Sequence, residues 1–393
     1  MLSLSVDIWR PVVSGGSQSL TAQVQALFAG GKVGGMWDMG DTATLFQDTA
    51  GSTPITAVTQ PIGIVLDKSR GLSLGAEAVP SINWNGGYTT NGAKQIPTGW
   101  TEYNQANVAS ATVLPNSYQF TATAHLAGIE LASPAATIIG RFNKYTIRAR
   151  KTAFVSGTPT LQLYTGAWQE IIPSGAAIGD WYTKTIHVLA TQTVIISSFT
   201  GSASWEIEYL TVKELPGNHA TQPTAGSRPL YQVVSGYGCA QFDAVDDALL
   251  FPAITFGGAF NTFVAGKVTG GTSGVHLWRT ADWGGGYWAV YQQNDNASPT
   301  GGAAGTPSYF VNGVALSPVE RGRVYTLING VDSVVESIGV TLSAETALQF
   351  SGYPTVPFIG NAHRVLMISG TLTATEKLLC RRWVAEGNGV TVV

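Results

Sequence analysis

Two segments decide the architecture of this chain: "PIGIVLDKSRG" at residues 61–71 and "PGNHATQPTAGSRP" at residues 216–229. Each is too short to be a structural unit, and the second reads as a continuation of the first. The residues between them hold their own series of strands, whose ends adjoin the two segments. Because the termini of a sandwich domain often lie close together, one domain can be inserted into a loop of another. The sequence therefore predicts an inserted domain at 72–215 within a host domain formed by 31–71 and 216–393.

The composition indicates a protein built from short strands and tight turns. Charged residues make up 11% of the 393 residues, hydrophobic residues make up 44%, and there are 47 glycines and 11 tryptophans. Disordered chains carry more charge and fewer aromatic residues, and helical cytosolic enzymes have surfaces richer in Lys and Glu. Gly, Thr, Ser, Val and aromatic residues in this abundance favour strands and turns, so the predicted fold class is all-β.

Strand-like segments recur at a regular spacing within residues 72–215. They include "SYQFTATA", "NKYTIRARKTA", "PTLQLYTG", "WYTKTIHVLA", "TVIISSFT" and "SWEIEYLTVKEL". Polar and apolar residues alternate well in "YTIRARK" and "WEIEYLTV", as they do in strands with one buried face. Many short strands with turn residues between them predict a β-sandwich.

The host domain shows the same pattern, with strand-like segments such as "FNTFVAGKV", "RVYTLING" and "HRVLMIS". It closes with "LTATEKLLCRRWVAEGNGV", in which Thr373 and Glu376 have the spacing of a capping box. An apolar stripe follows, and Gly387 can end the helix. We therefore predict two β-sandwich (jelly-roll) domains, one inserted in the other, with a short C-terminal helix.

Residues 1–30 are predicted to form an N-terminal arm and a short helix. Apolar residues at helical spacing in 20–28, followed by Gly30 and Gly31, predict the helix. The arm has strand-like alternation and can either form an edge strand of the host domain or add a strand to the sheet of a neighbour. Its apolar side chains are Leu2, Leu4, Val6, Ile8 and Trp9.

Several kinds of partner and location are disfavoured. The net charge is −3 and Lys and Arg form no block, so nucleic acid is not an expected partner. The first residues lack the pattern of a secretory signal, and no apolar run is long enough for membrane insertion. Two cysteines, Cys239 and Cys380, are too few for a zinc site or a disulfide framework. We expect free buried thiols, with a single bridge between them as the alternative.

Longer segments resemble proteins of tailed-phage virions. "FDAVDDALLF" at 242–251, "FIGNAHRVLMIS" at 358–369 and the C-terminal helical segment resemble concanavalin A-like, laminin-G-like jelly rolls. The stretch that begins "LFAGGKVGGMWDMGDTATLFQD" and resumes at residue 216 is similar to the start of phage tail-fibre or virion components. In such proteins a sandwich similar to carbohydrate-binding modules interrupts the chain at this place. The resemblance extends over nearly the whole chain.

The resemblance implies a non-enzymatic structural protein of the virion, made in the host cytoplasm and homo-oligomeric. Its expected position is the tail, as a fibre, a tip or a baseplate-associated adhesin. Capsid decoration or a head fibre is the alternative structural position. The N-terminal arm would then bind other virion proteins, and a glycan of the host surface is a further candidate partner.

The alternative class is a polysaccharide-degrading enzyme, because jelly rolls also include glucanases. Glycoside hydrolysis needs two carboxylates across a cleft. Glu206 and Glu208 lie on one strand, where an exposed polar face is the favoured interpretation. The five histidines lack the spacing of a zinc site or of a Ser-His-Asp triad. The sequence therefore predicts no catalytic residue.

Asp243, Asp246 and Asp247 form the densest acidic cluster of the sequence. Carboxylate oxygens suit calcium, so Asp243 and Asp247 are candidate ligands, and no other cofactor is predicted. Strand alternation would place Asp246 on the opposite face, which prevents all three from converging. A solvated turn at the start of a strand is the alternative interpretation.

The stretch "HLWRTADWGGGYWAVYQQND" is the densest aromatic stretch. Aromatic rings bind the apolar faces of sugars, so the stretch is a candidate glycan site. The alternative is that alternate members belong to the core or to a subunit contact. The candidate residues are Trp278, Trp283, Tyr287, Trp288 and Tyr291.

Overall fold

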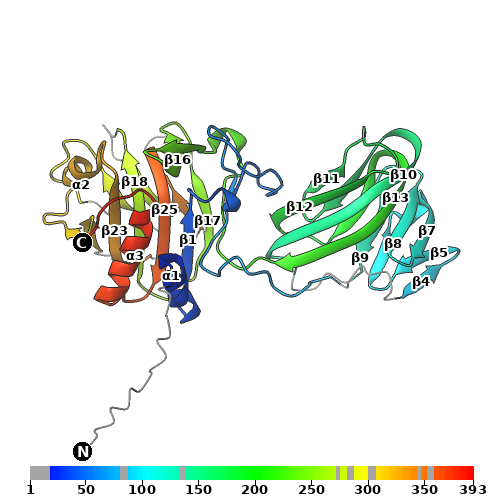
Figure 1. The fold of residues 1–393 in the computed structure, drawn as a ribbon, viewed down its shortest axis with the longest axis horizontal. Helices are drawn as coiled ribbons and strands as arrows, with labels where there is room; N and C mark the ends of the chain where they lie inside the picture. The colour runs from blue at the N-terminus through cyan, green and yellow to red at the C-terminus, as the bar shows by residue number, and fades with distance from the viewer. Residues whose placement is uncertain are drawn as a thin grey trace, which may run out of the picture.

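The computed structural model describes residues 18–79, 87–132, 138–270, 275–280, 287–299, 307–342, 347–351 and 358–393. Over these ranges the chain is mostly β-structure with three short α-helices, and its sheets form two bodies side by side (Figure 1). The predicted all-β class, with sandwich domains and a short C-terminal helix, is confirmed.

The host domain is a sandwich of two antiparallel sheets. Sheet A has the order β15-β16-β25-β18-β23-β21-β22, with β1 beside β25, and sheet B has the order β2-β3-β14-β17-β24-β19-β20. The strands of sheet A are β1 (Gly34–Asp38), β15 (Leu230–Val234), β16 (Tyr237–Asp243), β18 (Phe260–Val268), β21 (Ser308–Val311), β22 (Val314–Ala315), β23 (Ser333–Val340) and β25 (Ile359–Ser369). The strands of sheet B are β2 (Leu45–Phe46), β3 (Ile64–Val65), β14 (Ala220–Thr221), β17 (Leu249–Ala253), β19 (Val275–Thr280), β20 (Tyr287–Tyr291) and β24 (Ala347–Phe350).

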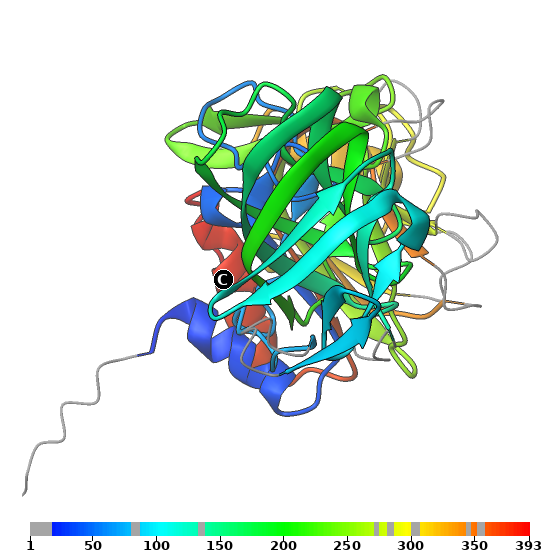
Figure 2. The same ribbon diagram turned by 90° about the vertical axis from the view of Figure 1, so that its right-hand side faces the viewer.

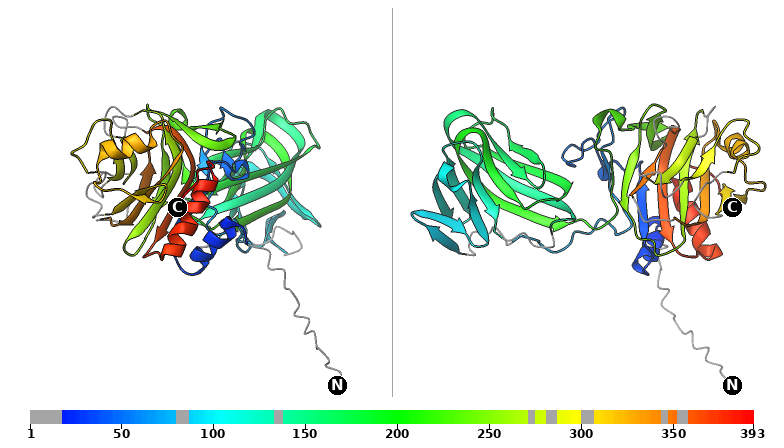
Figure 3. Two further views of the ribbon diagram at one scale, coloured as in Figure 1. Left: turned by 60° about the vertical axis from the view of Figure 1, so that its left-hand side comes forward. Right: turned by 180° about the vertical axis from the view of Figure 1, so that it is seen from behind.

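Two apolar layers stabilise the host domain. The main core lies between the sheets and includes Trp37, Phe242 and Trp278. A second layer, with Phe28 and Trp383, lies between the outer face of sheet A and two helices. These helices, α1 (Leu20–Ala29) and α3 (Ala374–Glu386), lie side by side on that face (Figure 3).

The inserted domain consists of sheet C and a small hairpin. Its strands are β4 (Tyr88–Asn91) and β5 (Lys94–Pro97) in the hairpin, and β6 (Trp100–Tyr103), β7 (Val108–Leu114), β8 (Ser117–Ala122), β9 (Ala127–Leu131), β10 (Phe142–Tyr164), β11 (Trp168–Ile172), β12 (Trp181–Leu189) and β13 (Ile195–Glu214) in sheet C. Strands β10 and β13 pair along most of their length, with register shifts between Arg148 and Thr160. Each contributes to both layers of this domain, which faces the viewer in Figure 2. One layer is β12-β10-β13-β8-β7 and the other is β11-β10-β13-β9-β6. A separate core lies between them.

The two segments that flank the insertion lie next to each other. Strand β3 pairs with β14, so that Val65 lies opposite Ala220. The buried carboxylate of Asp67 accepts a hydrogen bond from the backbone N–H of Asn218 at 2.7 Å. The backbone N–H of Asp67 donates to Nδ1 of His219 at 2.9 Å. The chain therefore leaves the host domain and returns to it at one hydrogen-bonded point.

Helix α3 confirms the sequence prediction in detail. The Thr373 hydroxyl accepts from the backbone N–H of Glu376, and the Glu376 carboxylate accepts from that of Thr373. Helix α1 is also confirmed, with Ser19 as its N-cap. Cys239 and Cys380 are free and buried, as expected.

One predicted strand is a helix. The segment "RVYTLING" lies largely in α2 (Arg321–Ile328). Its apolar residues fit either period, and the helix buries Val324 and Ile328 together against the main core. The two residues are four positions apart in the sequence, which places both side chains on the same face of the helix.

The predicted N-terminal arm, with Leu2, Leu4, Val6, Ile8 and Trp9, lies outside the described residues. Among the helices that the structure describes, each is too short or too polar to cross a membrane.

Candidate functional site

The aromatic stretch predicted to bind glycans lies in the core. Trp278 and Trp288 are opposite each other in β19 and β20 and are fully buried, with ring centroids 5.9 Å apart. Tyr291 is also fully buried. Trp283 lies outside the described residues, and only the backbone of Tyr287 is described. The prediction of an exposed glycan site at Trp278, Trp288 and Tyr291 is therefore wrong, and their placement in the core is the correct alternative.

A different set of aromatic residues gathers on the inserted domain. Strand register places the side chains of Tyr103, Tyr164, Trp168 and Phe199 on the outer face of the layer β11-β10-β13-β9-β6. None of the four belongs to the core between the layers. All four residues are half-buried, so each keeps part of its surface in contact with solvent. We call this outer surface the aromatic face.

Trp168 is the centre of the aromatic face. Its ring centroid lies 4.8 Å from that of Tyr164, 5.4 Å from that of Phe199 and 6.5 Å from that of Tyr103. Tyr103 and Trp168 belong to opposite edge strands, which would be about 19 Å apart in a flat five-stranded sheet. The face is therefore concave, and the rings meet over its middle.

Small residues under the rings make this arrangement feasible. Gly128 and Ser197 lie opposite each other in the central strands, and Ser197 is completely buried. A Cβ atom at Gly128 would lie 1.9 Å from the carbonyl oxygen of Ile196, so only glycine fits there. Because Gly128 has no side chain and that of Ser197 is small, there is room above them for the large rings.

The sequence contains little local signal for the aromatic face. Its four aromatic residues come from β6, β10, β11 and β13. Tyr164 and Trp168 are four residues apart, but Tyr103 and Phe199 are distant from them along the chain. Only strand register brings them together, and register between distant strands is not readable from a single sequence. Trp168 follows a turn at Gly166 and begins an edge strand, which is the one local hint of an exposed ring.

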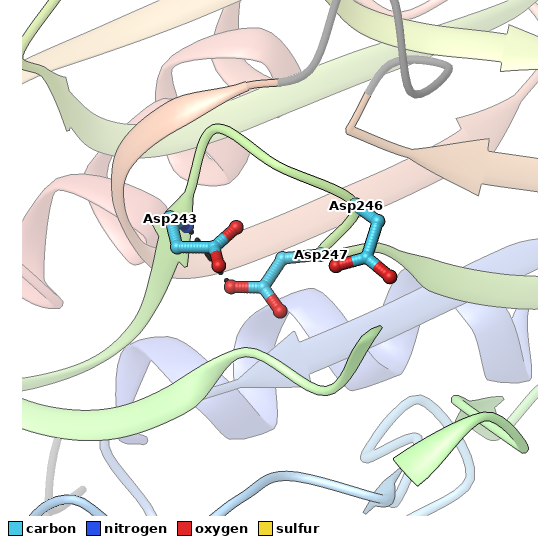
Figure 4. Close-up of side chains that lie close together, drawn as sticks. All are labelled: Asp243, Asp246 and Asp247. Carbon is cyan, nitrogen blue, oxygen red and sulfur yellow. Dashed lines mark hydrogen bonds between the residues drawn. The ribbon is translucent and has the colours of Figure 1, made fainter. Parts of the chain in front are cut away.

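A second candidate site is the acidic loop between β16 and β17 (Figure 4). The carboxylate oxygens of Asp243, Asp246 and Asp247 lie within 4.8 Å of one another. Strand β16 ends at Asp243, and Ala244 has a positive φ of 67°, so strand alternation does not continue. The expectation that Asp246 points away from the other two is therefore wrong.

Hydrogen bonds hold the loop in this form. The backbone N–H of Asp243 donates to Oδ2 of Asp247 at 2.9 Å, and the Ser227 hydroxyl donates to Oδ2 of Asp246 at 2.6 Å. Asp243 and Asp247 also line a pocket of about 580 Å³, whose wall includes Arg228. Calcium–oxygen distances of about 2.3–2.6 Å allow one ion to share oxygens with this separation. The donor set therefore fits the predicted calcium site.

Asp247 has an altered titration. Burial raises its pKa to about 7, and the carboxylates of Asp243 and Asp246 act in the same direction. Between the ordinary value near 3.8 and about 7, the folded protein binds more protons than the unfolded chain. Without a cation, this residue therefore makes the folded state less stable as the pH rises through that window.

We expect Asp247→Asn to raise the Tm of the host domain at pH 8 in the presence of a chelator. The amide keeps the acceptor for Asp243 without the buried charge. A gain of about 1 kcal/mol would raise Tm by about 2–4 °C in a domain of this size. At pH 4 the gain should vanish. Calorimetric melts of the full chain at both pH values check this.

Calcium should raise the Tm of the parent protein at pH 8 and have little effect on Asp247→Asn. The exposed Asp180→Asn variant is the matched control. If calcium raised the Tm of Asp247→Asn as much as that of the parent protein, the ion would bind elsewhere. If Asp247→Asn and the parent protein had the same Tm at pH 8 in chelator, the raised pKa of Asp247 would be contradicted.

Glu206 and Glu208, the acidic pair weighed for hydrolysis, both have arginine partners. Nε of Arg150 donates to Glu206 at 2.8 Å, and Arg148 pairs with Glu208. Both guanidinium groups lie over the ring of Trp181, at 4.5 and 4.8 Å from its centroid. These carboxylates are part of a charged ladder across β10 and β13.

Comparisons with known proteins identify no family. No family model matches the chain, and no curated protein matches it significantly. Among solved structures 13 chains match. One is the N-terminal CBM22-1-CBM22-2 tandem domain from Paenibacillus barcinonensis, which is 10% identical, covers 78% of this chain and 95% of that chain, and has a TM-score of 0.29. At that score the similarity carries no functional argument.

Proposed function

We propose that this chain is a non-enzymatic structural protein of a tailed-phage virion that binds carbohydrate through the aromatic face of its inserted domain. The virion part of the proposal rests on the sequence resemblance described above. The carbohydrate part rests on one observation: four half-buried rings meet on a concave sheet face around Trp168. Rings in this arrangement offer apolar faces to sugar C–H groups.

Polar groups for sugar hydroxyls accompany the rings. Gln162 and Thr101 share the aromatic face with Trp168, as the strand pairings require. His125 lies beside it, with its ring centroid 4.4 Å from that of Phe199. Apolar platforms flanked by a few polar groups are the usual composition of ligand sites.

We expect Trp168→Ala to weaken binding of the full chain to neutral polysaccharides by about 30-fold or more, the effect of a central aromatic contact. Retardation in native gels containing a glucan, a galactan or a mannan measures it. The control is Phe154→Ala, which removes an exposed ring elsewhere on the same domain. If no polysaccharide gel retards the parent protein, or if Trp168→Ala is retarded as strongly as the parent protein, the proposed carbohydrate binding is wrong.

The proposed position is the tail, as a fibre, a tip or a baseplate-associated adhesin. The N-terminal arm would dock on other virion proteins and the chain would be a homo-oligomer. Capsid decoration or a head fibre is the competing position. A cryo-EM map of the particle that locates the chain distinguishes them, and its absence from purified particles would contradict the virion role.

The enzymatic alternative receives no support from Glu206 and Glu208, because each is paired with an arginine. Incubation of the protein with a bound polysaccharide should release no oligosaccharide. Release that Glu206→Gln or Glu208→Gln abolishes would overturn the non-enzymatic proposal.

A further inference from the structure

The charged residues of the aromatic face are all acidic. Strand register assigns to it Thr101, Tyr103, Gly128, Glu130, Thr160, Gln162, Tyr164, Trp168, Glu170, Ile195, Ser197 and Phe199. The structure describes every residue of this set, and within it Glu130 and Glu170 are charged and neither Lys nor Arg occurs.

The two carboxylates lie on either side of the rings. Glu170 is on the same strand as Trp168, two positions further along, and is exposed. Glu130 lies on β9 towards the opposite edge, opposite Ile195, which in turn lies opposite Tyr164. Its Oε1 is 3.5 Å from the hydroxyl of Thr101. A sugar chain lying across the rings from edge to edge would therefore pass both carboxylates.

From these charges we propose that the aromatic face selects uncharged glycans and rejects those that carry carboxylate or phosphate groups. This inference rests on the proposed carbohydrate binding. A like charge about 4 Å away in water costs about 1 kcal/mol, which corresponds to about fivefold in affinity. Glu130 and Glu170 can still accept hydrogen bonds from neutral hydroxyls, so an uncharged chain carries no such penalty.

The test compares each neutral polysaccharide that retards the full chain with the same polymer oxidised at C6 to the uronate. Oxidation replaces the exocyclic hydroxymethyl group of each modified sugar by a carboxylate and leaves the rings and the linkages unchanged. We expect the oxidised form to bind at least about fivefold more weakly at low salt, with the difference shrinking as salt screens the charges.

In the Glu130→Gln/Glu170→Gln double variant, the ratio of the affinities for the neutral and the oxidised polymer should fall to about twofold or less, whatever the change in the affinity for the neutral polymer alone. Asp180→Asn, which removes an exposed carboxylate outside the face, is the matched control and should change neither affinity. Equal binding of both forms by the parent protein would overturn the charge selection, as would a double variant that leaves the difference intact.

The two proposals fail in different ways. If Trp168→Ala abolishes neutral binding but the charge comparison shows no difference, carbohydrate binding stands and the selectivity is wrong. If Trp168→Ala leaves binding unchanged, carbohydrate binding by this face is wrong and the selectivity falls with it.

Discussion

Trp278→Ala is expected to destabilise the host domain by about 3–5 kcal/mol, the cost of removing a buried Trp side chain and leaving a cavity. Trp278 is fully buried and its ring lies 4.9 Å from that of Phe350, 5.5 Å from that of Phe251 and 5.9 Å from that of Trp288. Domains are typically stable by about 5–15 kcal/mol, so this loss is a large fraction of the total. Scanning calorimetry should show the host-domain transition lowered by about 10 °C or more.

Comparison with Trp168→Ala separates a core ring from a surface ring. Trp278→Ala should leave polysaccharide binding intact at temperatures where the host domain stays folded, whereas Trp168→Ala should lose binding with little change in Tm. The reverse pattern would show that the aromatic stretch at 278–291, and not the aromatic face, is the ligand site.

The fold class was predictable because it depends on local patterns. Alternation in "YTIRARK" predicted part of β10, and the spacing of Thr373 and Glu376 predicted the start of α3. Helix α2 was not predictable in the same way, since its few apolar residues fit both periods. Packing of Val324 and Ile328 against the main core decides between them.

The candidate sites depend on contacts between distant residues, and here the sequence was a poorer guide. Proximity in sequence suggested a glycan site at Trp278 and Trp288, yet their cross-strand pairing stacks both rings in the core. Tyr103 and Trp168 meet because a five-stranded layer is strongly curved, which no local pattern encodes. The acidic loop was partly predictable. The sequence identified its three aspartates, but the turn at Ala244, which brings their carboxylates together, was not predicted.

The point where the chain leaves and re-enters the host domain depends on one buried carboxylate. Asp67 is completely buried. Its Oδ1 accepts from the backbone N–H groups of Met36 and Ser69, both at 2.8 Å. Its Oδ2 accepts from the Ser69 hydroxyl at 2.8 Å and from the backbone N–H of Asn218 at 2.7 Å. A single side chain thus binds strand β1, the end of the first flanking segment and the start of the second.

Asp67→Ala is therefore expected to lower the stability of the host domain by about 3–5 kcal/mol, because a buried donor left without its acceptor costs about 1–3 kcal/mol and charged partners cost more. Ser69→Ala removes one donor and leaves the carboxylate with three partners, so it should cost only about 1 kcal/mol. Calorimetry of both full-length variants against the parent protein measures the difference.

The inserted domain should keep its own transition in Asp67→Ala. Its core lies between the layers of sheet C and contains none of the groups that Asp67 binds. Contacts between the domains that the structure describes include the hydrogen bond of His187 to the carbonyl of Gly51, the packing of Phe142 on His219 at 4.3 Å, and a small apolar cluster that contains Phe46 and Phe142. If Asp67→Ala lowered both transitions equally, the two domains would unfold as one unit and the carboxylate would stabilise the whole chain. If it lowered neither, the hydrogen bonds of Asp67 would be dispensable and the two flanking segments would be held together by β3 and β14 alone.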